Sequence, residues 1–168
     1  MKINKNGFTL IELLLYISLT AIMLLGLVMF LSILLQARIK NQTIAEVEQQ
    51  GMQVMQAITK SIEEAQSINT PTQGANGSSL SLQMPIISNN PTVFSLVDDT
   101  IQMTQGVSPI INLTNSRLIT TSLNFNNVSR TDIPGIIKIE FNLEHINPEG
   151  RNEYKFNKTF YSSTNLSY

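Results

Sequence analysis

The sequence predicts an α+β fold in which one long N-terminal helix packs on an antiparallel β-sheet. No proline occurs between Met1 and Thr70, and apolar residues either dominate this stretch or recur in it at helical spacing. After Asn69, short segments of alternating apolar and polar residues are separated by turn-forming residues, a pattern typical of β-hairpins. A helix followed by consecutive hairpins indicates a helix packed on one face of an antiparallel sheet.

The apolar run from Phe8 to Leu35 contains a single charged residue, Glu12. As a helix its 8–35 span would measure about 42 Å, because each residue adds about 1.5 Å. The hydrocarbon core of a bilayer is about 30 Å thick, so the run is long enough to cross it. A secretory signal peptide has a shorter apolar region of about 7–15 residues. We therefore expect residues 8–35 to form a transmembrane helix.

Beyond the membrane the helix is expected to continue as an amphipathic segment over residues 36–68. Small and apolar residues recur along one face: Ile44, Val47, Gly51, Val54, Ile58 and Ala65. Gly51 is a weak point, because glycine costs up to about 1 kcal/mol relative to alanine inside a helix. The acidic residues are expected to form a solvated face: Glu46, Glu48, Glu63 and Glu64.

Residues 69–168 are expected to form an outer, β-rich domain. A turn-rich stretch from Asn69 to Gly77 opens it. Asp98-Asp99 predicts a tight hairpin turn, although the usual glycine is missing, and Pro109 places its strand at a sheet edge. Asn147 to Gly150 is a further turn. The expected strands are 79–84, 93–97, 100–103, 107–113, 118–125, 136–143 and a closing strand with Tyr154, Phe156, Thr159 and Tyr161.

Composition excludes several kinds of chemistry. The formal net charge is −1 and no basic cluster occurs, which argues against nucleic acid as an electrostatically driven partner. The absence of cysteine excludes disulfides, thiolate metal ligands and cysteine nucleophiles. His145 is the only histidine, so a structural or surface role is expected for it. Calcium takes six to eight oxygens, so Asp98 and Asp99 are interpreted as turn formers. We predict no catalytic residue, metal or cofactor.

The N-terminal residues 1–12 carry the strongest indication of function. A polar leader from Met1 ends at Gly7, Phe8 starts the apolar run, and Glu12 is the fifth residue after the glycine. A carboxylate at the centre of a spanning helix costs about 2.5–3.5 kcal/mol on insertion scales, so an acid in such a run is a functional hypothesis by default. A plain signal anchor explains the length of the run but not this combination of glycine, phenylalanine and glutamate.

The segment Gly7-Phe8-Thr9-Leu10-Ile11-Glu12 resembles the prepilin signal of type IV pilins and type II secretion pseudopilins, and the resemblance extends to Ile22. It implies a pilin-like fold, a leader peptide over residues 1–7, cleavage by prepilin peptidase between Gly7 and Phe8, and N-methylation of Phe8. It also implies that Glu12 acts in subunit assembly, paired with the N-terminal amine of a neighbouring subunit, and that residues 8–35 become the filament core.

The same resemblance implies the partners and the location. The partners are other pilin or pseudopilin subunits, prepilin peptidase, an inner-membrane assembly platform and, before assembly, membrane lipid. The chain is expected to be prokaryotic and to cross the cytoplasmic membrane once with its N-terminus in the cytoplasm. It would then join an extracellular or periplasmic filament.

The order of helix and strands resembles the J/W class of minor pilins and pseudopilins. The expected function is a structural, non-enzymatic subunit that primes or joins a type IV pilus or a type II secretion pseudopilus. The alternatives are a pilus-tip binding subunit for adhesion or DNA uptake, or a plain membrane-anchored binding domain. DNA capture needs an exposed basic strip, and the outer cations are scattered along the sequence: Arg117, Arg130, Lys138, Arg151, Lys155 and Lys158.

Overall fold

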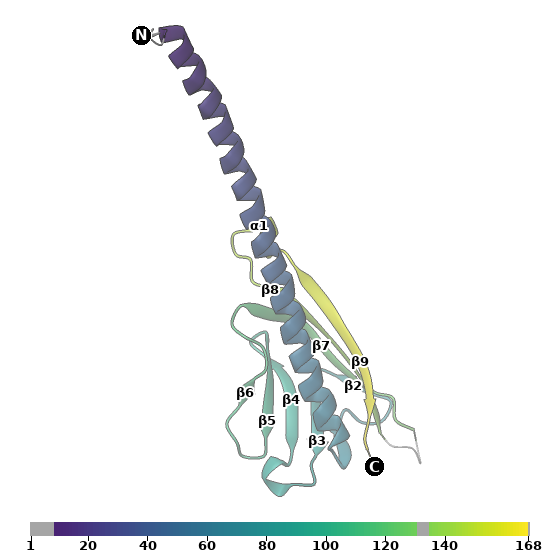
Figure 1. The fold of residues 1–168 in the computed structure, drawn as a ribbon. Helices are drawn as coiled ribbons and strands as arrows, with labels where there is room; N and C mark the ends of the chain where they lie inside the picture. Colours follow the sequence, from purple (N-terminus) through teal and green to yellow (C-terminus); the bar gives the residue numbers. More distant parts are fainter. Residues whose placement is uncertain (1–8, 131–134, 168) are drawn as a thin grey trace, which may run out of the picture. The chain divides into compact units, whose positions relative to one another are not determined.

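The computed structural model describes residues 9–130 and 135–167, and these form one long helix and two antiparallel sheets (Figure 1). The expected α+β class is confirmed. The elements are α1 (Leu10–Glu63), β1 (Ser67–Thr70), β2 (Asn76–Gly77), β3 (Ser79–Gln83), the 3-10 turn η1 (Ile87–Asn89), β4 (Thr92–Val97), β5 (Thr100–Gln105), β6 (Ile111–Asn112), β7 (Leu118–Asn127), β8 (Ile136–His145), the 3-10 turn η2 (Asn152–Tyr154) and β9 (Asn157–Asn165). The chain divides into two compact units, residues 1–39 and 40–168.

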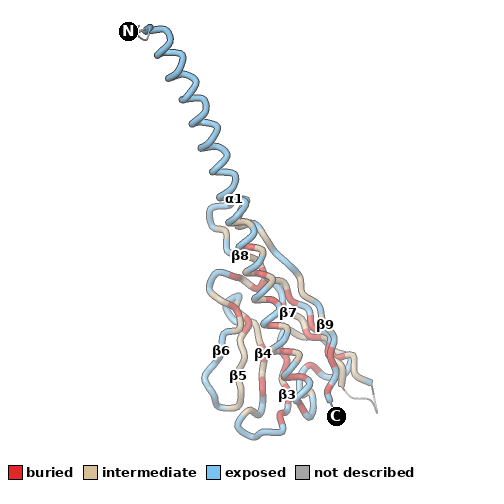
Figure 2. The backbone as a smooth tube through the Cα atoms, viewed as in Figure 1, coloured by how far each residue is buried: buried red, intermediate tan, exposed pale blue. Residues whose placement is uncertain are grey.

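The first unit consists, in its described part, of the apolar portion of α1. Every residue from Leu10 to Arg38 is exposed (Figure 2). Three of its hydroxyl side chains are satisfied within the helix, because Ser18, Thr20 and Ser32 donate to backbone carbonyls three or four residues earlier. The helix is long and apolar enough to cross a membrane. An exposed, internally hydrogen-bonded apolar helix is suited to a lipid environment.

In the second unit, α1 buries the face that the sequence pattern predicts. Four of the expected positions in the helix are buried, Val47, Gly51, Val54 and Ile58, and the expected Ala65 is buried just beyond its end. Ile44 is only half-buried, and its neighbour Thr43 is buried instead. The whole hydrophobic core lies between Val47 and Leu166, and it joins this helix face to both sheets. The second unit therefore has a core of its own.

The helix ends earlier than predicted. It stops at Glu63 rather than at residue 68, and Ser67–Thr70 forms β1. The backbone N–H of Gln66 donates to the carbonyl of Gln83 at 2.8 Å, and β1 then pairs antiparallel with β3. The sheet thus supplies the backbone partners that another helical turn would have supplied, and serine, asparagine and threonine gain little from remaining helical.

The strands form two sheets rather than the single sheet expected. One has the order β1-β3-β4-β5-β6 and the other β2-β7-β8-β9, with every pairing antiparallel. The chain crosses between them at β2, inside the stretch expected to be only a turn, and again after β6. The sheets are linked by a hydrogen bond from the N–H of Thr120 to the carbonyl of Asp99 at 2.8 Å.

The predicted hairpin at Asp98-Asp99 is confirmed. Both residues have positive φ, 47° and 57°, and they join β4 to β5 as the two central residues of a tight turn. Aspartate tolerates this conformation because its side chain can bond to nearby backbone.

Two other strand predictions are partly wrong. The stretch 107–113 contributes only the two-residue strand β6, which does lie at a sheet edge. The closing strand begins at Asn157, so Thr159 and Tyr161 lie in β9 whereas Tyr154 and Phe156 precede it. Tyr154 belongs to η2, where its ring stacks on His145 with centroids 5.4 Å apart.

Candidate functional site

Glu12 lies in the first turn of α1, where Thr9 caps the helix. The carbonyl of Thr9 accepts a hydrogen bond from the N–H of Leu13 at 3.1 Å, and its Oγ1 accepts one from the N–H of Glu12 at 3.4 Å. Thr9-Leu10-Ile11-Glu12 therefore has the spacing of a capping box. The hydroxyl of Thr9 also donates to Oε2 of Glu12 at 3.5 Å, which is at the long limit for a hydrogen bond.

The charge of Glu12 has no cation beside it within the described part of the chain. It is the single charged residue between Phe8 and Ala37, and the residues around it are exposed and apolar. The capping role of Thr9 was not predicted, although the spacing from threonine to glutamate is a sequence signal for it. Gly7 and Phe8, the predicted processing residues, lie outside the described residues.

In the second unit, His145 belongs to a structural cluster. Its ring is buried, its Nδ1 lies 2.9 Å from the carbonyl of Ile146, and its Nε2 lies 3.8 Å from Oε2 of Glu46. The other carboxylate oxygen of Glu46 accepts a hydrogen bond from the Asn115 amide at 2.8 Å and forms an ion pair with the Arg117 guanidinium at 2.9 Å. Buried polar groups with partners of this kind hold a fold together.

The expectation of a wholly solvated acidic face on α1 is therefore wrong for Glu46, whose side chain is only 20 % exposed. The helix pattern places it correctly beside the core stripe, but its partners lie more than 65 residues away in the sequence, Asn115 in a loop and His145 at the end of β8. Glu48 also has a distant partner, because Lys158 pairs with it.

Several outer cations are engaged within the domain. Arg117 pairs with Glu46, Lys158 pairs with Glu48, and Arg151 pairs with Glu153 at 2.7 Å. The ion pair raises the pKa of the Arg151 guanidinium, chiefly through its hydrogen bond to the Glu153 carboxylate. A cation already paired with a carboxylate is poorly placed to neutralise a phosphate.

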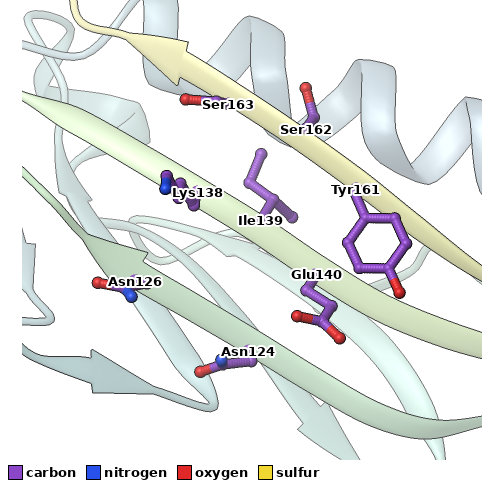
Figure 3. Close-up of a pocket in the computed structure, with 8 residues that line it drawn as sticks. All are labelled: Asn124, Asn126, Lys138, Ile139, Glu140, Tyr161, Ser162 and Ser163. Atoms are coloured by element: carbon purple, nitrogen blue, oxygen red, sulfur yellow. The ribbon is translucent and has the colours of Figure 1, made fainter.

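The outward face of the four-stranded sheet carries a shallow hollow of about 340 Å³ (Figure 3). Two cross-strand rows line it: Asn124, Glu140 and Tyr161 in one, and Asn126, Lys138 and Ser163 in the other. The rows hold one acid, one base, amides and hydroxyls, and they end at β9, where the Tyr161 side chain is 70 % exposed. This face contains no histidine or cysteine to activate a nucleophile.

The described residues show no group of three or more side chains able to hold a metal ion. Asp98 and Asp99 are committed by their positive φ angles to the β4–β5 turn, as predicted.

The long helix begins with an apolar stretch that has a lone acid in its first turn, and its later part packs on antiparallel sheets. This arrangement is consistent with a pilin-like fold. The family model of the prokaryotic N-terminal methylation motif matches residues 2–28, which include Gly7, Phe8 and Glu12. This motif supports a type IV pilin-like protein. No curated protein and no solved structure matches the chain.

The motif implies membrane anchoring, processing by prepilin peptidase and assembly with other pilin subunits in general. The order of helix and strands leads us to expect the J/W class, but the motif does not distinguish that class from other pilin-like proteins.

Proposed function

We propose that the chain is a minor pilin or pseudopilin of the J/W class that primes or joins a type IV pilus or a type II secretion pseudopilus. The observation that carries this proposal is Glu12, a carboxylate with no cationic partner among the described residues, at the start of an exposed apolar helix. A charge in lipid persists when it is paired, and filament assembly provides a partner.

Processing supplies that partner. Cleavage between Gly7 and Phe8 frees an amine at the start of the apolar helix of each subunit. The amine of a neighbouring subunit then pairs with Glu12 and fixes the axial position of one helix against the next. Helix burial cannot decide incorporation by itself, because moving an apolar helix from lipid into a filament core is nearly neutral in hydrophobic terms.

Assembly through Glu12 also implies where the subunit is located and what role it has. The N-terminus starts in the cytoplasm, the anchor holds the subunit in the cytoplasmic membrane, and an assembly platform moves it into an extracellular or periplasmic filament. The subunit is structural rather than enzymatic. The buried, stacked and hydrogen-bonded state of His145 supports this, as do the ion pairs that engage Arg117, Arg151 and Lys158. These ion pairs also argue against the alternative of DNA uptake.

The test is the incorporation of Glu12→Ala and Glu12→Gln variants of the full chain into filaments in the native host. We expect both variants to be cleaved after Gly7 and to be depleted from sheared filaments, because neither can pair with an amine. Thr9→Ala is the control for the capping role, since it removes the cap and keeps the charge. Co-assembly of Glu12→Gln at the wild-type level would contradict the proposal.

A further inference from the structure

Strand β9 is a long, open edge of the four-stranded sheet. It pairs with β8 through nine consecutive residue pairs without a register shift, and among residues 9–130 and 135–167 the sheet order places no strand on its other side. It has no proline or glycine and one charged residue, Lys158. The other terminal strands, β1, β2 and β6, have two to four residues each. Proteins usually shorten, bulge or charge their sheet edges to prevent pairing, and β9 has little of this protection.

The register identifies the backbone groups on that edge. The N–H of His145 donates to the carbonyl of Phe156 at 3.0 Å, and the N–H of Leu166 donates to the carbonyl of Gly135 at 2.9 Å. Hydrogen-bonded pairs alternate along an antiparallel ladder, so the even-numbered residues of β9 bond to β8. Residues 159, 161 and 163 therefore direct their N–H and C=O groups to the open side. Within the described residues, these groups have no backbone partner.

The helix continues past the inner face of this edge. Lys158 pairs with Glu48, the Phe160 ring lies against Gly51, and the hydroxyl of Thr164 donates to Glu63 at 3.4 Å. Met52, Met55 and Thr59 fall at helical spacing between Glu48 and Glu63, so they continue the helix stripe that borders β9.

This stripe is partly open. The Met52 side chain is 55 % exposed. A hollow of about 570 Å³ lies on the helix there, lined by Met55, Gln56, Thr59, Lys60, Glu63 and Glu64. Because Glu63 both lines the hollow and contacts Thr164, the hollow borders β9. A strand added beside β9 would run next to this stripe.

We propose that β9 accepts an extended segment of a different pilin-like subunit, which adds to the sheet as a further strand. This inference rests on the proposed function, and it names the surface through which the outer domain contacts its neighbour. The segment supplies backbone groups to residues 159, 161 and 163, and uncharged side chains to the Met52–Met55 stripe. A second β9 is a poor occupant, because antiparallel self-pairing is two-fold and closes a dimer, whereas a filament needs a contact that propagates.

The experiment places a photo-crosslinking amino acid at Tyr161 or Ser163 of the full chain in its native host, with Asn124 in the interior strand β7 as the control position. We expect both edge positions, and not Asn124, to crosslink to one extended peptide of another subunit that carries its own prepilin signal. Crosslinks to a second copy of this chain alone, to non-pilin proteins alone, or to nothing would overturn the proposal.

Two substitutions sharpen the test. Ser163→Pro removes a free-edge N–H without removing a bond to β8, and it should lower the crosslink yield at Tyr161 about tenfold, whereas Ser163→Ala should not. Met52→Glu leaves the backbone of β9 unchanged but charges the stripe, and it should lower the yield as well. Gln53→Glu, on an exposed neighbouring position, is its control. Unchanged yields in both Ser163→Pro and Met52→Glu would contradict strand addition.

The N-terminal peptide from the same sample separates a failure of strand addition at β9 from a failure of the proposed pilin function. Loss of the crosslink in a chain that begins at methylated Phe8 overturns strand addition and leaves the proposed function standing. A chain that still begins at Met1, in cells that process other prepilins, overturns the proposed function itself.

Discussion

The ring of Phe160 in β9 occupies the space that a side chain at position 51 of α1 would need. A Cβ built on Gly51 would overlap the ring atoms of Phe160. The ring also stacks on Phe141 of β8 with centroids 5.2 Å apart, and the ammonium of Lys158 lies 5.6 Å from its centroid. A glycine that weakens the helix locally therefore allows the last strand to pack closely against it.

Gly51→Ala should destabilise the second unit even though alanine is the better helix former by about 1 kcal/mol. Overpacking costs about 1–3 kcal/mol, so we expect a net loss of up to about 2 kcal/mol in the free energy of unfolding. Urea unfolding of residues 40–168 measures it, because that unit contains the whole core. In a Phe160→Ala background the same Gly51→Ala change should become neutral or stabilising. An equal loss in both backgrounds would refute the steric explanation.

Glu46→Ala and Glu48→Ala form a matched pair on one helix. Removing the Glu46 carboxylate takes away the acceptor of the Asn115 amide and the charged neighbour of Nε2 of the buried His145, so we expect a loss of about 1–3 kcal/mol in the free energy of unfolding. Glu48 pairs with Lys158 at a site about 40 % exposed on both sides, which predicts a loss below about 1 kcal/mol. Equal effects in denaturant titrations would mean that the Glu46 cluster has no structural role.

Thr120→Val should stabilise the domain by up to about 1 kcal/mol. The Thr120 hydroxyl is buried, and no residue in the described part of the chain accepts or donates a bond to it. Valine has nearly the same shape and leaves no polar group unpaired. Thr114→Val is the control, since its Oγ1 accepts a bond from the N–H of Ile101 at 3.3 Å and its loss should destabilise. Thermal unfolding of the two variants should give shifts of opposite sign.

The Glu153 carboxyl should titrate below its usual pH range. Its own backbone N–H donates to it and Arg151 forms an ion pair with it, and both lower its pKa. A lowered pKa means that the interaction stabilises the folded state above the usual glutamate pKa, and that this stabilisation is lost as the pH falls through the lower value. An NMR titration should show the pKa rising in Arg151→Gln. A pKa unaffected by that substitution would assign the whole shift to the backbone bond.

The local elements of the fold were largely predictable, whereas their partners were not. The helix stripe from Val47 to Ile58 and the Asp98-Asp99 hairpin follow from periodicity and turn chemistry, which act over a few residues. The division into two sheets depends on two-residue strands such as β2 and on pairings between distant segments, which leave no local pattern. The early end of α1 has the same cause, because Gln66 finds its backbone partner in β3.

In the candidate site too, local sequence patterns identify individual residues but not their distant partners. Glu12 stands out in the sequence because a single charge interrupts an apolar run, and its pairing with an amine stays a prediction. The spacing from Thr9 to Glu12 is itself a sequence signal for the helix cap. The helix pattern predicts a solvated Glu46, because it cannot locate partners that lie far away in the sequence: Asn115 in the β6–β7 loop and His145 at the end of β8.

The most direct test of the central claim is the N-terminus of the protein isolated from its native membrane, read by mass spectrometry of its first peptide. Processing as a pilin-like subunit predicts a chain that begins at N-methylated Phe8. A chain that begins at Met1 or Lys2, in cells whose other prepilins are cleaved, would contradict the account. Glu12 would then be a helix-capping residue in a simple membrane anchor.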